Sequence, residues 1–337
     1  MTPLELSSLW TALIGAGHSA SGMDRRRLDA DAAVDVYACV FWPRGRPGLL
    51  IEGAGKVAGL ADRIPRCRGV RVLHDLIAVE DRPERTVLVV MLDDDRLRDI
   101  FAVLSADLVN AVVAEPTVAD GLRRCVDRLC MWQGLFERIA PEGLTPERQR
   151  GLLGELLALE GIFLAEIEPL DAVGSWFGSE SAHQDFVHAG IAVEVKTTLA
   201  KRHARIMIAN EKQLDELPYA RLVLAVIKLD ERAADGITLP EQVARIRTAL
   251  LADTLAAKTF DDRLLLADYL DVHAPLYETR YHAQVPQLFS VQGDFPRLTE
   301  ANLPAGVGDI RYSVVADDLD AYALDAASLS ALLRGQV

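Results

Sequence analysis

Two carboxylates and a lysine lie within one short segment, residues 185–196. Asp185 is followed by Glu194, and Lys196 comes two positions after Glu194. Residues two apart on a β-strand project from the same face, so Glu194 and Lys196 would be neighbours there. Carboxylate oxygens suit Mg²⁺, which keeps several waters and binds substrate phosphates. A lysine beside the ion could hold or deprotonate an attacking water, which completes the parts needed for metal-assisted phosphodiester hydrolysis.

A turn between the two carboxylates would bring them together. His188-Ala189-Gly190 is typical of such a turn, and the run that begins with Asp185 could pair back against residues 193–197. The resulting hairpin places both carboxylates and the lysine at one point.

Glu-x-Lys on a strand is also common as a solvated ion pair with no role in catalysis. Here Glu194 and Lys196 alternate with Val193 and Val195, and the apolar run 222–229 is typical of a buried strand. Charged side chains in the sheet of a domain core need partners. The context therefore favours a metal site over a solvated surface.

The elements around this hairpin can be placed from capping and periodicity. Thr145 is a candidate N-cap with Pro146 at the first helical position, and the helix that follows embeds Glu155 among leucines. A buried carboxylate there must be paired, protonated or metal-facing. The expected order is a helix with Glu155, strands near Trp176, Asp185 and Glu194, a helix from Asn210 that carries Gln213, and a strand at 222–229.

This order resembles the PD-(D/E)XK nuclease fold, the restriction-endonuclease-like α-β-β-β-α-β core. More narrowly, the chain is similar to a bacterial PD-(D/E)XK family that had only a domain-of-unknown-function label and is found among restriction and phage-defence genes. The segments that carry this resemblance are Gly151-Leu-Leu-Gly-Glu-Leu, Trp176, Gln184-Asp185-Phe186, Val193-Glu-Val-Lys-Thr197, Lys212-Gln-Leu214, and further stretches toward both ends of the chain.

The resemblance implies roles for individual residues. Asp185, Glu194 and Lys196 match the nuclease triad, Glu155 matches the acidic residue of the first helix, and Gln213 matches a polar residue on the next helix. The Pro of the namesake motif is absent, because Gln184 precedes Asp185.

The implied function is Mg²⁺-dependent DNA endonuclease, with Mn²⁺ as a substitute ion, in a restriction-modification or phage-defence system. Asp185 and Glu194 would bind the ion with the Val195 carbonyl, and Glu155 would complete or support the metal shell. Partners would be DNA and either a second copy of the chain or other defence-system proteins. The alternative is a catalytically inactive DNA-binding or scaffold subunit of such a system.

Charge limits how DNA could be bound. The formal net charge of −14 repels duplex DNA on average, and nonspecific affinity comes from Lys and Arg on phosphates. A local basic strip can still bind while the whole chain is acidic. The best candidate strip abuts the proposed metal site and consists of Lys201, Arg202, His203 and Arg205.

The fold class expected is α/β of the mixed α+β kind, in three blocks. They are an N-terminal α+β domain (1–142), the nuclease core (144–232), and a C-terminal helical and β block (233–337). No apolar run is long enough for a membrane span, so no membrane contact is expected. The four cysteines lack zinc-like spacing, and reduced thiols in a cytoplasm are expected.

Overall fold

The computed structural model describes residues 1–16, 21–78, 83–138, 142–178, 183–199, 204–231 and 235–336. The chain forms two compact units, Met1–Pro141 and Glu142–Val337. Both units combine helices with β-sheet, so the expected mixed α+β class is confirmed. No helix within the described ranges is long and apolar enough to cross a membrane.

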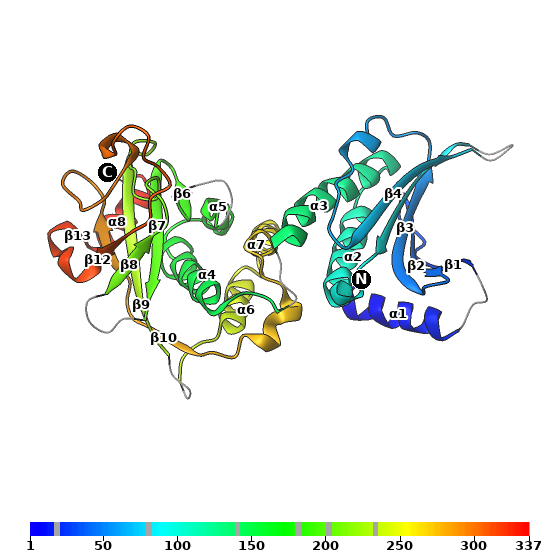
Figure 1. Ribbon diagram of the computed structural model, residues 1–337, viewed down its shortest axis with the longest axis horizontal. Coiled ribbons are helices and arrows are strands. Elements are labelled where there is room, and N and C mark those ends of the chain that lie inside the picture. The colour runs from blue at the N-terminus through cyan, green and yellow to red at the C-terminus, as the bar shows by residue number, and fades with distance from the viewer. Residues whose placement is uncertain are drawn as a thin grey trace. The chain divides into compact units, whose positions relative to one another are not determined.

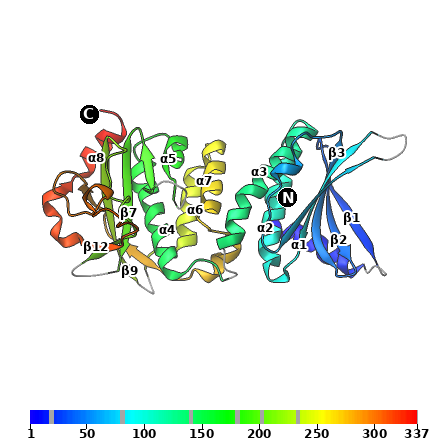
Figure 2. The same ribbon diagram turned by 45° about the horizontal axis from the view of Figure 1, so that its top comes forward.

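The N-terminal unit is an antiparallel sheet with helices on one face (Figures 1 and 2). The strands in sheet order are β1 (Gly22–Asp29), β2 (Asp35–Trp42), β3 (Arg46–Ala54), β5 (Arg85–Leu92) and β4 (Val70–Ile77). The helices are α1 (Pro3–Gly15), α2 (Arg98–Val113) and α3 (Val118–Arg138). Strand β1 was not predicted, because its Asp-Arg-Arg-Arg run lacks apolar alternation.

The C-terminal unit is built on a second sheet. Its strands in order are β13 (Ala323–Leu324), β11 (Gln287–Ser290), β9 (Arg221–Glu231), β7 (Ile191–Thr198) and β6 (Phe186–His188), with β10 (Tyr281–Ala283) also paired to β9. Strands β7 and β9 are parallel, and the other pairs are antiparallel. A separate antiparallel pair is formed by β8 (Arg205–Ile208) and β12 (Tyr312–Val315).

Helices cover one face of this sheet, and the β8–β12 pair lies on the other (Figures 1 and 2). The helices of the unit are α4 (Pro146–Ala158), α5 (Pro169–Ser175), α6 (Leu239–Ala249), α7 (Thr254–Leu266) and α8 (Ala326–Leu333). Val193 and Val195 of β7 join the core that contains α4, whereas Ala192 joins the core beneath β8 and β12. Strand alternation therefore turns Glu194 and Lys196 toward the β8 side.

Short helical turns connect these elements. A π-helical turn (Leu159–Phe163) continues α4. The 3₁₀ turns are Ala61–Arg63, Asp95–Leu97, Asp271–Leu276, Glu300–Asn302, Ala316–Asp318 and Asp320–Tyr322.

Two elements of the predicted core order are wrong. Trp176 lies in no strand; it follows α5 and makes a single β-bridge to Phe186. Gln213 lies in a run of turns instead of a helix. The Asn210 and Asp215 side chains accept the backbone N–H groups of Lys212 and Leu217, and such local bonds compete with helix formation.

The C-terminal segment completes the sheet of the core. Strands β10 and β11 both pair with β9, which lies inside the block 144–232. The structure thus groups 142–337 as one unit where the sequence was divided near 232. Sequence periodicity identifies strands but does not tell which of them pair.

Candidate active site

A tight hairpin positions Asp185. Ala189 and Gly190 have φ of +47° and +81° between β6 and β7, as a two-residue type I′ turn requires. Phe186 pairs with Val193, so Asp185 begins the hairpin beside Glu194. Its Oδ2 accepts the Val195 backbone N–H at 2.7 Å. The turn expected at 188–190 is confirmed.

Glu194 and Lys196 face the same side of β7, as their spacing predicts. Lys196 Nζ donates to Glu194 Oε1 at 2.5 Å. The Glu194 side chain is 1% exposed and that of Lys196 is 18% exposed. The second carboxylate oxygen, Glu194 Oε2, is buried and has no hydrogen-bond partner among the described residues. A buried carboxylate oxygen without a hydrogen-bond donor is unfavourable, so a further ligand would stabilise it.

Burial and mutual repulsion perturb the pKa values of this cluster. Burial, followed by repulsion from Asp185, raises the pKa of Glu194 to about 8. Burial also raises the pKa of Asp185, although Lys196 and the Val195 N–H oppose the shift. Burial would lower the pKa of Lys196, but attraction to Glu194 and Asp185 outweighs it and raises that pKa. Strong perturbations by burial and specific charges are typical of functional sites.

Glu155 reaches the same cluster from α4. Thr145 caps this helix by accepting the Arg148 N–H, and Pro146 occupies its first turn, as predicted. Trp176 Nε1 donates to Glu155 Oε2 at 2.8 Å. Burial and then repulsion from Asp185 raise the pKa of Glu155 to about 8, so the two carboxylates are close enough to interact.

A glycine allows α4 to approach β7. A Cβ at Gly154 would overlap Thr197 Cγ2, so a side chain there would push the helix off the strand. Gly178 lies beside Glu155 Oε2 with a φ of +55°, a conformation that favours glycine. The sequence shows both glycines but not the contacts that require them.

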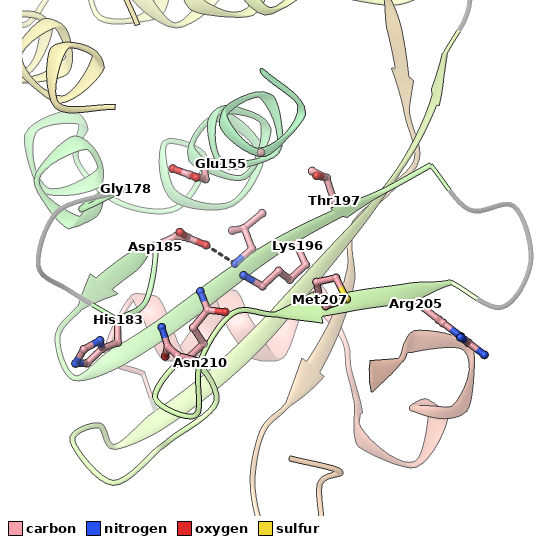
Figure 3. A pocket seen from close by; sticks show the side chains of 12 residues that line it. Glu155, Gly178, His183, Asp185, Lys196, Thr197, Arg205, Met207 and Asn210 are labelled. Atoms are coloured by element: carbon pink, nitrogen blue, oxygen red, sulfur yellow. Dashed lines mark hydrogen bonds between the residues drawn. The ribbon is translucent and has the colours of Figure 1, made fainter. Parts of the chain in front are cut away.

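The cluster opens into a cavity of about 540 Å³ (Figure 3). Asp185 and Lys196 line it together with Glu155 from α4 and Asn210 from the turn after β8. The exposed His183 also lines it. Glu194 is fully buried and is not one of the residues that line the cavity. The cavity thus offers carboxylate, ammonium and amide groups to one bound molecule.

The remaining predicted site residues fall into three groups. Val195 and Gln213 line the cavity, although the Gln213 Oε1 accepts the Ala209 backbone N–H at 2.8 Å. Arg205 also lines it, at a distance from the Asp185–Lys196 cluster and with its guanidinium turned away (Figure 3). Lys201, Arg202 and His203 lie outside the described residues.

A metal ion at this site would need waters as well as protein ligands. Within the described part of the chain, no three His, Cys, Asp or Glu side chains are arranged to hold a metal by themselves. Mg²⁺ needs only one or two carboxylates, because it keeps several waters. The unpartnered Glu194 Oε2 and the neighbouring Asp185 meet that need.

Sequence reasoning missed two residues that hold the site together. Gln184 is 2% exposed and bonds to the turn that carries Gln213, and Tyr219 donates to Gln184 Oε1 at 2.6 Å. No local pattern links residues 35 positions apart, so nothing in the sequence could have signalled this contact.

Comparison with known proteins identifies a family. The model of the family described as "Putative PD-(D/E)XK family member, (DUF4420)" matches residues 6–317. No curated protein and no solved structure matches the chain. Because the family match spans nearly the whole sequence and its region includes the Asp185, Glu194 and Lys196 cluster, this chain belongs to that family of PD-(D/E)XK-type proteins.

Proposed function

We propose that this protein is a Mg²⁺-dependent DNA endonuclease with a restriction-endonuclease-like core, serving a bacterial restriction or phage-defence system. One observation carries the proposal: a buried carboxylate, Glu194, bonds Lys196 through one oxygen and has no partner for the other among the described residues. Asp185 lies beside it at the wall of a cavity. Family membership supports the same class of activity.

The residues present fit a divalent cation. Asp185, Glu194 and the Val195 carbonyl would hold the ion, and Glu155 would support that set from α4. A bound Mg²⁺ would supply Lewis-acid polarisation of the phosphate and a water of lowered pKa. Mn²⁺ has the same oxygen-ligand preference and would substitute.

Lys196 would act directly on the substrate. Its raised pKa keeps the amine protonated at neutral pH. As an ammonium it donates hydrogen bonds, so it would orient the attacking water and offset negative charge on the phosphoryl oxygens. The Glu194 bond fixes the position of the amine before substrate arrives. Gln213 would contribute its carboxamide at the cavity wall.

DNA would be held by the basic strip expected from the sequence, Lys201, Arg202, His203 and Arg205. The described member of this strip, Arg205, is exposed and lines the cavity. Residues 142–337 contain 18 Lys and Arg against 30 Asp and Glu, so contact with DNA must be local. Binding by a few phosphate contacts should weaken steeply as salt is raised.

The test is metal-dependent cleavage of supercoiled plasmid by the full chain, alone and with the proteins encoded beside its gene. Nicked or linear product is expected with Mg²⁺ or Mn²⁺ and not with EDTA. Asp185→Asn should abolish cleavage while leaving the fold intact. Cleavage that persists in EDTA would contradict the metal dependence, and absence of cleavage under every condition would favour an inactive DNA-binding or scaffold subunit.

A further inference from the structure

We propose that Gln184 is a positioning residue that ties the Asp185 end of the hairpin to the turn at residues 209–214 and so sets the spacing of the two cavity walls. The inference rests on the proposed function, because it assigns Gln184 a part in holding Asp185 ready for a metal ion. The residue itself takes no part in the reaction.

Three hydrogen bonds use the whole Gln184 carboxamide. Its Nε2 donates to the carbonyl oxygens of Lys212 and Gln213, at 2.9 and 3.3 Å. Its Oε1 accepts from the Tyr219 hydroxyl at 2.6 Å. Only 2% of the residue's surface is exposed, so these bonds lie away from bulk water.

The two ends of this link are both parts of the cavity. Asp185 is the next residue in the chain, and it lines the wall formed by the hairpin. Asn210 and Gln213, from the turn, line the same cavity. The turn is not part of a regular helix, and it carries two i,i+3 backbone hydrogen bonds, from Gln213 N–H to the Asn210 carbonyl at 3.4 Å and from Asp215 N–H to the Lys212 carbonyl at 3.2 Å. Side chains that reach the turn from elsewhere therefore add to what holds its geometry.

The outer side of the same turn is anchored separately. The Glu211 carboxylate accepts the backbone N–H groups of Asp309 and Ile310, and Arg297 forms an ion pair with Glu216. The C-terminal segment thus holds the turn through Glu211, while Gln184 holds it through the carbonyl oxygens of Lys212 and Gln213. Loss of Gln184 should therefore shift the turn relative to Asp185 without releasing it from the fold.

An amide is required at position 184 for a chemical reason. Two backbone carbonyls must receive a donor, and the NH₂ group of glutamine supplies two N–H bonds. Glutamate has the same shape but would set carboxylate oxygens against those carbonyls. Gln184→Glu is therefore the near-isosteric test, Gln184→Met removes the polar group at similar volume, and Tyr219→Phe removes one bond of the three.

The chain provides a matched control in a second buried glutamine. Gln242 is fully buried, and its Nε2 donates to Glu160 Oε2 at 2.8 Å, but it does not line the cavity. Gln242→Met removes a buried amide whose Nε2 donates to Glu160 and to the Leu156 carbonyl and whose Oε1 has no partner among the described residues. It separates general loss of stability from loss of positioning.

The experiment compares the full-length variants by calorimetric titration with Mn²⁺ and by amide hydrogen exchange without metal. Gln184→Glu and Gln184→Met should bind Mn²⁺ about 10-fold more weakly, the lower end of what loss of an outer-shell partner costs. Exchange should rise in residues 185–188 and 209–214. Tyr219→Phe should show a smaller effect in both readouts, and Gln242→Met should match the unaltered protein in both.

Each measurement tests a separate part of the proposal. Unchanged Mn²⁺ affinity in Gln184→Glu, or an equal loss in Gln242→Met, would overturn the positioning role. Unchanged exchange at 209–214 would overturn the link between the two walls, whatever the metal result. A failure of the proposed function appears differently, as an unaltered protein that neither binds Mn²⁺ nor cleaves DNA.

Discussion

Lys196 and Glu194 share one short hydrogen bond, 2.5 Å from Nζ to Oε1, while the other Glu194 oxygen stays buried without a partner in the described structure. One oxygen of this carboxylate therefore holds an ammonium, and under the proposed function the other would take a cation. Most ion pairs between residues of a strand lie at the protein surface, where water solvates both charges and no further ligand is needed. Here the carboxylate is 1% exposed, so its second oxygen matters to stability as well as to function.

Glu194→Gln tests this dual role. The substitution keeps the shape, removes the buried negative charge and weakens the metal site. We expect DNA cleavage to fall by at least about 100-fold, because loss of an outer-shell partner already costs up to that much and Glu194 would bind the ion directly. The metal-free variant should also melt at a higher temperature than the unaltered protein at pH 8. A variant that cleaves normally would show that Glu194 holds no metal.

The raised pKa values predict how stability depends on pH. The pKa values of Glu155 and Glu194 rise to about 8 in the folded protein from a usual 4.5. Groups with raised pKa values contribute stability that is complete below about 4.5 and is lost as pH rises through about 8. The melting temperature in EDTA should therefore fall between pH 6 and pH 9.

Metal should reverse that trend. A divalent cation replaces the protons lost from the carboxylates, so the gain in melting temperature with Mn²⁺ should be larger at pH 9 than at pH 6. Differential scanning fluorimetry measures both series, and Glu194→Gln should make the series in EDTA shallower, because Glu155 alone of the two then contributes. A Mn²⁺ shift that is the same at every pH would show that metal and protons do not compete for these groups.

Two glycines of α4 give opposite predictions for stability. Gly154→Ala would force a methyl group into Thr197 and should destabilise the protein by about 1–3 kcal/mol. Gly151→Ala meets nothing within 4 Å and should stabilise it by about 0.5–1 kcal/mol, because alanine favours the helix. Urea unfolding measures both. Equal effects of the two substitutions would mean that α4 does not lie tightly on β7.

Assembly is a further expectation. One active site cuts one strand at a time, so cleavage of both strands favours a second copy or a partner subunit. Residues 1–141 contain 18 Lys and Arg against 20 Asp and Glu, so two copies of this unit repel each other less than two copies of the acidic C-terminal unit do. Light scattering should give at least twice the 36.9 kDa of one chain, or co-purification should recover a partner. A strict monomer that cuts both strands unaided would count against this.

Local patterns in the sequence were enough to predict the centre of the site. Period-2 alternation placed Glu194 and Lys196 on one face, the Ala189-Gly190 turn placed Asp185 beside them, and Thr145 marked the start of α4. Each of these signals is local and follows from backbone geometry alone. Their roles in metal binding and catalysis remain predictions.

The surroundings of the site depend on contacts distant in sequence. The turn at Gln213 was predicted as a helix because its Asn210 start looks like a cap, yet Gln184 and the Glu211 contact to Ile310, 99 positions away, hold it in another shape. Pairing of β10 and β11 with β9 is equally nonlocal. Such contacts leave no periodic trace in a single sequence.

The most direct test of the nuclease assignment compares two lysines that differ in little but location. Lys228 lies on β9, next to β7, is 19% exposed and bonds Asp317 at 2.9 Å, whereas Lys196 is 18% exposed and bonds Glu194. The measurement is the initial rate of plasmid nicking in Mg²⁺ by Lys196→Met and Lys228→Met, each checked for an unchanged fold by circular dichroism. Lys196→Met should lose about 100-fold or more, the effect of removing one group that stabilises transition-state charge. Lys228→Met should stay within about twofold of the unaltered protein. Equal rates for the two variants would contradict the assignment of Lys196 and with it the proposed active site.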